Sequence, residues 1–511
     1  MTEKEVTLHF DEEFIGYVFI FFCMCLFTFY AFLATKTAFL GEDEISYFRM
    51  SKEMHEGKFT GFTFDGQPIT APLMLSFISS ILFNVLGEQL AVLKVVSSMF
   101  GLFSVILLYF AVKKLKGIMP AILTSSLMMS MIIFSHFLVV AYVEDMIVFF
   151  SSLVIFILTM ERNTKYALLL GLSITLAFFA KQSGLMLFPV VFIYLLWTKE
   201  NKKYILISLM IPLAIWGVFI LHNISVYRIP AVFILNDIWY KLYGNPYPET
   251  SLPEFKAVGK LFFTDVFPSV GYVPMLFILI GFYYVYLNPE EKFTKISIIA
   301  VIIFMILSAS MLFLHEARYM TIIFPFMVLM TAGYWEGVKK LFADKNKVWI
   351  FYLIAGALVV WFIHDSLITV QATSTTQRWN PSYINGLQWI RNNTKTDATI
   401  FTAYGGSVYY YADRNYTWVT PKFPEIMRST NSTIVYNDLV NQGVDYIYIW
   451  QGIVGNDYII PQSNLFGIFT VNFMNLVRND TSHFTEVFQN DIGVIYKVEK
   501  NESQSNISQP K

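Results

Sequence analysis

The sequence has little charge and almost no cysteine. Of its 511 residues, 14% are charged, whereas soluble domains usually carry about 25%. The net charge of −1 gives no reason to expect nucleic-acid binding. Both cysteines, Cys23 and Cys25, lie inside one apolar run, so they cannot staple a soluble loop. These shortages exclude a disulfide-rich secreted domain and an ordinary soluble enzyme.

Nucleotide and metal signatures are also missing. The chain has no Walker phosphate loop, no G-x-G-x-x-G loop, no His/Cys group at metal-ligand spacing and no repeat at a solenoid period. We therefore expect no nucleotide or other cofactor. A divalent cation is only weakly suggested, because Asp43, Glu44 and Asp145 offer oxygen ligands.

Long apolar runs dominate what is present, since 56% of the residues are hydrophobic. A helix needs about 20 apolar residues to cross the ~30 Å hydrocarbon layer. Eleven segments approach or reach this length. They are residues 14–40, 89–112, 118–140, 146–160, 166–180, 185–197, 205–221, 266–287, 296–314, 320–335 and 348–367. The sequence predicts a polytopic α-helical membrane protein.

Charge decides how a further apolar stretch, residues 71–86, is placed. Five short Lys/Arg-rich loops fall on one side with the N-terminus only if this stretch does not cross the membrane, and basic loops favour the cytoplasm. We expect residues 71–86 to form a helix that lies at the outer interface or dips into the membrane without crossing it. The N-terminus is then cytoplasmic, and the C-terminal region lies outside. The five loops are residues 113–116, 162–165, 199–203, 292–295 and 339–347.

The mean hydropathy falls sharply after about residue 370. From there on, the pattern of apolar and polar residues is typical of a soluble domain. Short β-branched and aromatic runs at 398–402, 446–450 and 493–498 predict strands, and 383–391 has helical spacing. We predict a transmembrane catalytic domain over 1–370, an extracytoplasmic α/β domain over 371–498 and a disordered tail over 499–511. Six N-x-S/T sequons agree with an external location: Asn392, Asn415, Asn431, Asn479, Asn501 and Asn506.

This topology gathers the unusual polar residues at the outer face. Ionisable groups near hydrocarbon tend to face a cavity and to have partners. Most of these polar residues also have an alternative explanation. Asp43 and Glu44 could form a solvated loop or a helix cap, and Glu144 and Asp145 could cap the next helix as a pair. Lys181 could be a snorkelling side chain, and Arg318 could pair with Glu316 or with lipid phosphate. The candidate set is Asp43, Glu44, Tyr47, Glu144, Asp145, Lys181, His315, Arg318 and Tyr319.

Residues of these types suit the transfer of a sugar from a lipid-linked donor. Outside the cytoplasm a sugar donor must arrive already activated, and a sugar on a polyprenyl phosphate does so within the bilayer. A carboxylate can take the acceptor's proton. Arg and Lys can stabilise the leaving phosphate. The aromatic residues Tyr409, Tyr410, Tyr411 and Trp418 either stack on sugar or fill the core of the C-terminal domain.

The ordered motifs resemble the GT-C glycosyltransferases of the protein O-mannosyltransferase and aminoarabinose transferase type. The matching features are Asp43-Glu44 with Tyr47 after the first span, the Pro-containing apolar helix that ends before Gly87, Asp145 opening a later span, Lys181 before Gly184, and Arg318-Tyr319 before Pro325.

The resemblance implies an inverting membrane enzyme that uses a polyprenyl-phosphate hexose or pentose such as dolichyl-phosphate-mannose. The acceptor would be a glycan, lipid or protein. It implies Asp43 as general base, Asp145 as a positioning carboxylate, and Lys181 and Arg318 facing the phosphate. The basic residue that relatives carry before the interfacial helix is replaced here by Ile69-Thr70-Ala71. The oligosaccharyltransferase motif W-W-D-Y-G is absent, which argues against en bloc transfer to asparagine.

Two other functions fit a polytopic chain. A transporter or flippase would place ionisable residues at mid-span or show inverted repeats, and neither is visible. A non-catalytic scaffold or receptor would use the external domain for recognition alone.

Overall fold

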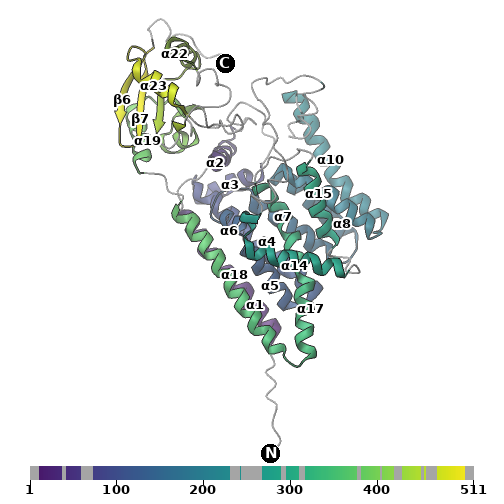
Figure 1. Cartoon of the computed structure of the whole chain (residues 1–511). Helices are drawn as coiled ribbons and strands as arrows, with labels where there is room; N and C mark the ends of the chain where they lie inside the picture. The colour runs from purple at the N-terminus through teal and green to yellow at the C-terminus, as the bar shows by residue number, and fades with distance from the viewer. Residues whose placement is uncertain are drawn as a thin grey trace, which may run out of the picture. The chain divides into compact units, whose positions relative to one another are not determined.

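The computed structural model describes most of the chain in two compact units (Figure 1). The first unit comprises Met1–Thr37, Tyr47–Pro246 and Phe255–Thr376, and the second comprises Ala38–Ser46, Tyr247–Glu254 and Gln377–Lys511. The described residues are 11–36, 42–58, 73–228, 230, 242, 267–288, 295–309, 317–376, 381–402, 405–418, 429–450, 454–455 and 469–500.

The first unit is helical. Five of its described helical segments are long and apolar enough to cross a membrane: Glu12–Lys36, Leu90–Lys116, Lys202–Val226, Arg318–Asp344 and Val348–Ser374. The elements in chain order are α1 (Glu12–Lys36), α2 (Glu42–His55, which begins in the second unit), α3 (Met74–Leu86), α4 (Leu90–Lys116), α5 (Ile118–Met129), α6 (Ile132–Phe137), α7 (Glu144–Leu158), α8 (Thr164–Ala180), η1 (Gln182–Met186), α9 (Leu187–Trp197), α10 (Lys202–Tyr227), α13 (Phe267–Val270), α14 (Tyr272–Leu287), α15 (Lys295–Ala309), η3 (Ala317–Ile323), α16 (Phe324–Leu329), α17 (Thr331–Asp344) and α18 (Val348–Thr376).

Helix α3 corresponds to the predicted interfacial helix. Its 13 residues rise about 20 Å at 1.5 Å per residue, too short for the hydrocarbon layer. Its length therefore suits a helix that does not cross, and the count of eleven spans stays a prediction.

Several predicted continuous spans are broken helices. The segment 118–140 divides into α5 and α6, and 320–335 divides into η3, α16 and α17. Buried hydroxyls take up carbonyls at the first break, where Ser130 bonds the Leu127 carbonyl at 2.8 Å and Ser135 bonds the Met129 carbonyl at 2.5 Å. Such side-chain partners allow a helix to be interrupted at membrane depth. The hydropathy of the sequence shows only that the segment is apolar, so it does not reveal where the helix is interrupted.

The second unit contains a five-stranded mixed sheet in the order β2-β1-β3-β7-β6. Strand β1 (Thr399–Thr402) is parallel to β2 (Asn415–Trp418) and β3 (Tyr446–Trp450), while β7 (Gly493–Val498) is antiparallel to β3 and to β6 (Phe484–Gln489). A separate parallel pair joins β4 (Val454–Gly455) and β5 (Phe469–Thr470). The predicted strands at 446–450 and 493–498 are confirmed.

Helices cover both faces of this sheet (Figure 1). Helices α22 (Ser432–Asn441) and α23 (Val471–Asn479) pack on the face that presents Phe401, Ile447 and Tyr496. Helix α19 (Pro381–Asn393) and the π-turn η4 (Val408–Ala412) pack on the opposite face, which presents Ile400 and Tyr448. Because strand residues point alternately to opposite faces, a sheet buried on both sides needs the apolar runs seen in the sequence.

Arg414 ties the end of α19 to the end of η4. The side chain is 6% exposed. Its guanidinium donates to the Thr394 hydroxyl at 2.9 Å and to the carbonyls of Arg391, Thr394, Ala412 and Asp413 at 2.6 to 3.2 Å. The planar guanidinium has five N–H donors, and it satisfies backbone carbonyls that the ends of α19 and η4 leave without partners.

We expect Arg414→Lys to destabilise the second unit, because a lysine ammonium cannot reach the two sets of carbonyls that the fork joins. The loss should be roughly 2–3 kcal/mol in free energy of unfolding, as for a lost charged hydrogen-bond group. Chemical unfolding of the full-length protein in detergent, followed by Trp fluorescence, measures it. Arg391→Lys is the matched control, since only the backbone carbonyl of that exposed residue is used. Equal stability of the two variants would contradict this role of Arg414.

Candidate active site

The site begins where α4 packs against the start of α7. Ser97 on α4 donates to the Tyr142 carbonyl at 2.6 Å, and its hydroxyl lies 3.4 Å from Asp145 Oδ2. Ser98 donates to the Leu138 carbonyl. Small side chains let membrane helices approach closely, and their hydroxyls bond across the contact. The turn that carries Asp145 is therefore fixed to α4.

Asp145 is fully buried in the first turn of α7. Its carboxylate lies close to Gly101 of α4, where an added Cβ would come within 3.3 Å of Asp145 Oδ2 and would collide with Leu138. The helix N-terminus favours a negative charge at this position. Asp145 Oδ1 has no hydrogen-bond partner among the described residues. This oxygen can accept a proton donor from a bound molecule.

Glu144, the neighbouring residue, forms a buried ion pair with Lys181. The Lys181 ammonium lies 2.5 Å from Glu144 Oε1, and the two side chains are 13% and 1% exposed respectively. Lys181 follows the last residue of α8 in an extended conformation, with φ −161° and ψ 141°. Its ammonium also lies 4.4 Å from the ring centroid of Tyr319, a cation–π contact. Three separate elements therefore converge on one cation.

Arg318 brings a second cation from η3. Its guanidinium carbon lies 5.8 Å from the Tyr142 ring centroid and 5.5 Å from that of Tyr319. A hydrogen bond of 2.8 Å from Ser151 of α7 to the Ile322 carbonyl holds η3 against α7. Arg318 and Lys181 thus both lie close to the ring of Tyr319.

The structure therefore brings together five of the predicted residues within the first unit: Glu144, Asp145, Lys181, Arg318 and Tyr319. No side-chain cap bond starts α7, so Glu144 and Asp145 are not a simple cap pair. Lys181 bonds Glu144 and does not extend to water alone, as a snorkelling side chain would.

Asp43 and Glu44 lie in the first turn of α2 and belong to the second unit, while Tyr47 belongs to the first. Glu44 is fully buried and Tyr47 is 7% exposed. Burial, together with the charge of Glu44, raises the pKa of Tyr410 in η4. The Tyr47 carbonyl accepts bonds from Ser51 at 2.6 Å and from Ser76 at 3.0 Å. The catalytic role of Asp43 stays a prediction.

His315 lies outside the described residues. Within the described parts of the chain, no group of three or more His, Cys, Asp or Glu side chains is placed to hold a metal ion.

Lys94 is a buried cation that the sequence reasoning missed. It lies in the second turn of α4 and is only 1% exposed. Ser97, Ser98 and Gly101 follow it at helical spacings of three, four and seven residues, so it shares the α4 face that meets α7. The signal was available, because a lysine inside an apolar segment is by default a functional candidate.

The comparisons with known proteins agree with this geometry. Residues 70–227 match the family model described as dolichyl-phosphate-mannose-protein mannosyltransferase. The structure of ArnT from Cupriavidus metallidurans bound to undecaprenyl phosphate is similar, with a TM-score of 0.65 and 11% identity over 97% of this chain and 99% of that one. No curated protein matches by sequence.

Two structures of the Archaeoglobus fulgidus oligosaccharyltransferase AglB share the fold. The complex with an inhibitory peptide and a dolichol-phosphate has a TM-score of 0.55 and 12% identity over 84% of this chain and 69% of that one. The form tethered to an acceptor peptide with an NVT sequon has a TM-score of 0.58 and 12% identity, covering 85% and 69%. The predicted fold class, a polytopic helical protein with a small C-terminal sheet domain, is confirmed.

We expect Lys181→Met to destabilise the first unit by roughly 3–5 kcal/mol, because it leaves the Glu144 carboxylate buried without its cation. Glu144→Gln should cost less, since Lys181 is the more exposed partner. The double variant Glu144→Gln/Lys181→Met should recover most of the loss, because no charge is then left unpaired. Unfolding of the purified protein in mixed micelles measures all three.

The control is Arg49→Met, which removes an ion pair with Glu53 on α2 whose side chains are 40% and 20% exposed. That change should cost under about 1 kcal/mol. Strictly additive effects of the two single site variants would show that Glu144 and Lys181 do not stabilise each other.

Proposed function

Because the chain is a multi-pass membrane protein with the GT-C glycosyltransferase fold, we propose that it transfers a sugar from a polyprenyl-phosphate donor to an acceptor hydroxyl. The observation that carries the proposal is the convergence of Lys181 and Arg318 beside two buried carboxylates, Glu144 and Asp145. The transfer takes place on the extracytoplasmic side, with the N-terminus in the cytoplasm.

The reaction needs a base and a cation. The acceptor oxygen attacks the anomeric carbon of the sugar, its proton passes to a carboxylate, and the bond between that carbon and the phosphate oxygen breaks. The sugar configuration inverts in such a single displacement. Negative charge gathers on the departing polyprenyl phosphate, so preorganised cations stabilise the transition state.

Lys181 and Arg318 supply these cations. The Lys181 ammonium has three N–H donors, and its 2.5 Å bond to Glu144 fixes the direction of one of them. Arg318 offers a planar fork that fits a phosphate with two parallel bonds. The ring of Tyr319 lies against both side chains and limits their rotation. The pair thus presents positive charge without reorganisation during the reaction.

The carboxylates divide into two roles. Asp43 is the general base that accepts the acceptor proton. Asp145, whose Oδ1 is open, accepts a hydrogen bond from a hydroxyl of the acceptor or the sugar and orients it. Glu144 keeps Lys181 in place, and Glu44 and Tyr47 support the start of α2. The transferred unit is a hexose or a pentose, and the acceptor is a glycan, lipid or protein.

We expect Asp43→Asn to lower kcat by about 10²–10⁴-fold, the usual contribution of a general base, while the Kd for the donor stays within a few-fold. Purified protein in nanodiscs, given a panel of radiolabelled polyprenyl-phosphate sugars, reports loss of sugar from the lipid. Glu53→Gln, a carboxylate further along α2, is the control. Full activity of Asp43→Asn would contradict the base assignment, and sugar accumulation in proteoliposomes without covalent transfer would favour a transporter.

We expect Asp145→Asn to act mainly on the acceptor. An amide of the same size keeps the contact with Ser97 but presents a neutral group, so KM for the acceptor should rise by about tenfold, as for one weakened charged hydrogen bond of ~1.5 kcal/mol. Steady-state kinetics with the acceptor varied at saturating donor give the acceptor KM, and kinetics with the donor varied at saturating acceptor give the donor KM. Ser97→Ala tests the same carboxylate through its support. An unchanged acceptor KM together with a raised donor KM would assign Asp145 to the phosphate side.

A further inference from the structure

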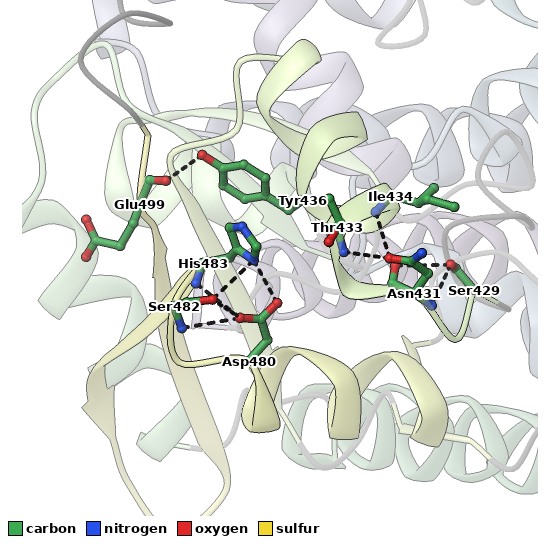
Figure 2. A network of polar contacts seen from close by, with 9 residues as sticks. All are labelled: Ser429, Asn431, Thr433, Ile434, Tyr436, Asp480, Ser482, His483 and Glu499. Atoms are coloured by element: carbon green, nitrogen blue, oxygen red, sulfur yellow. Dashed lines mark hydrogen bonds and ion pairs between the residues drawn. The ribbon is translucent and has the colours of Figure 1, made fainter.

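The second unit contains an asparagine whose amide oxygen is hydrogen-bonded, while its amide nitrogen is not bonded to any described residue. Asn431 begins α22, and its Oδ1 accepts bonds from the backbone N–H groups of Thr433 at 3.0 Å and Ile434 at 3.4 Å (Figure 2). Ser429 Oγ accepts the Asn431 N–H at 3.1 Å. These two backbone donors identify the oxygen of the amide, so its nitrogen points the other way.

The amide nitrogen belongs to a side chain that is exposed to solvent. Asn431 and Thr433 are both exposed. Within the described residues, neither the Asn431 Nδ2 nor the Thr433 hydroxyl has a hydrogen-bond partner. The residues Asn431-Ser432-Thr433 form an N-x-S/T sequon, which requires this amide nitrogen and this hydroxyl together.

Ring and hydrogen-bond contacts surround the sequon. Tyr436, one turn into α22, stacks on His483 with ring centroids 4.2 Å apart, and its hydroxyl donates to the Glu499 carbonyl at 2.7 Å (Figure 2). His483 in turn bonds Asp480 at 2.7 Å. Tyr436 is thus held against His483 and Glu499, while the residue Asn431 stays exposed.

We propose that Asn431 is a site of N-linked glycosylation, modified by a separate oligosaccharyltransferase that uses a lipid-linked saccharide. The Asn431 Nδ2 forms a bond to the anomeric carbon, and the bond from that carbon to the lipid phosphate oxygen breaks. The amide proton passes to a base of the transferring enzyme, and the lipid phosphate departs as an anion. Oδ1 keeps its two bonds, so the helix cap survives the modification.

Other described sequons are less open. In Asn392-Asn393-Thr394, the Thr394 hydroxyl donates to the Ile390 carbonyl at 2.7 Å and accepts from Arg414. Asn415 lies in strand β2, and its Nδ2 donates to the Asp397 carbonyl at 3.4 Å. In both, a group that the transfer requires is already engaged.

Asn479 is exposed but lies inside α23 as its last residue. The middle residue of its sequon, Asp480, accepts bonds from Ser482 and His483, which fix the turn that contains Thr481. Asn431 instead precedes its helix with extended dihedral angles, φ −109° and ψ 111°. Of its sequon, only Ser432 and Thr433 lie in a helix, as the first two residues of α22, so a transferring enzyme has at most the first turn to open.

The test uses full-length protein made in a host without N-glycosylation and reconstituted in nanodiscs. It is incubated with a purified single-subunit oligosaccharyltransferase and its lipid-linked oligosaccharide, and occupancy of each sequon is measured by peptide mass spectrometry. A synthetic peptide of residues 427–437 is the positive control. The assay does not depend on the proposed sugar transfer or on membrane orientation.

Three variants separate modification from folding. Thr433→Ala removes the hydroxyl but keeps the N–H that bonds Asn431, and Asn431→Asp keeps the cap oxygen but removes the nitrogen. We expect glycan on Asn431 in wild type and Thr433→Ser, and complete loss at this site in Thr433→Ala and Asn431→Asp, with unchanged thermal midpoints. The proposal is overturned if the peptide accepts glycan and folded wild type does not. It is also overturned if Asn392, Asn415 or Asn479 is occupied more fully than Asn431.

Discussion

The ion pair between Glu144 and Lys181 is the interaction on which the candidate site depends. A cation placed against a carboxylate that is 1% exposed offsets much of the cost of burying that charge. The pair connects the start of α7 to the end of α8. Tyr319 of η3 adds its ring to the same ammonium. The cation that we propose for the leaving phosphate is therefore also the one that compensates the buried charge of Glu144.

Close helix packing sets the other half of the site. Gly101, Ser97 and Ser98 on α4 leave room for the turn before α7, and the serine hydroxyls bond that turn. A larger residue at Gly101 would displace Asp145. The same contact buries Asp145 while leaving one of its oxygens without a partner among the described residues. A buried acceptor without a partner costs stability, which is expected where binding matters more than folding.

The sequence predicted the kind of molecule and several elements correctly. Strands 446–450 and 493–498 follow from β-branched and aromatic runs, and the grouping of Glu144, Asp145, Lys181, Arg318 and Tyr319 follows from topology. It missed the interruptions after Met129 and in the 320–335 segment. At the first of these, serine hydroxyls inside the fold take up carbonyls of the broken helix, which hydropathy does not report. It also missed Lys94, although a lysine inside an apolar segment is itself a signal, and the structure shows that this lysine is buried.

The sequence alone determined that this chain enters a membrane, since apolar runs of that length have no other stable place, and that a soluble α/β region follows. It also determined which residue types were available for the chemistry. Only the tertiary structure decided which charged side chains form pairs. The pairing of Lys181 with Glu144 rather than with Asp145 and the open oxygen of Asp145 are distances and directions. They arise from packing between segments far apart in the chain, which no local pattern encodes.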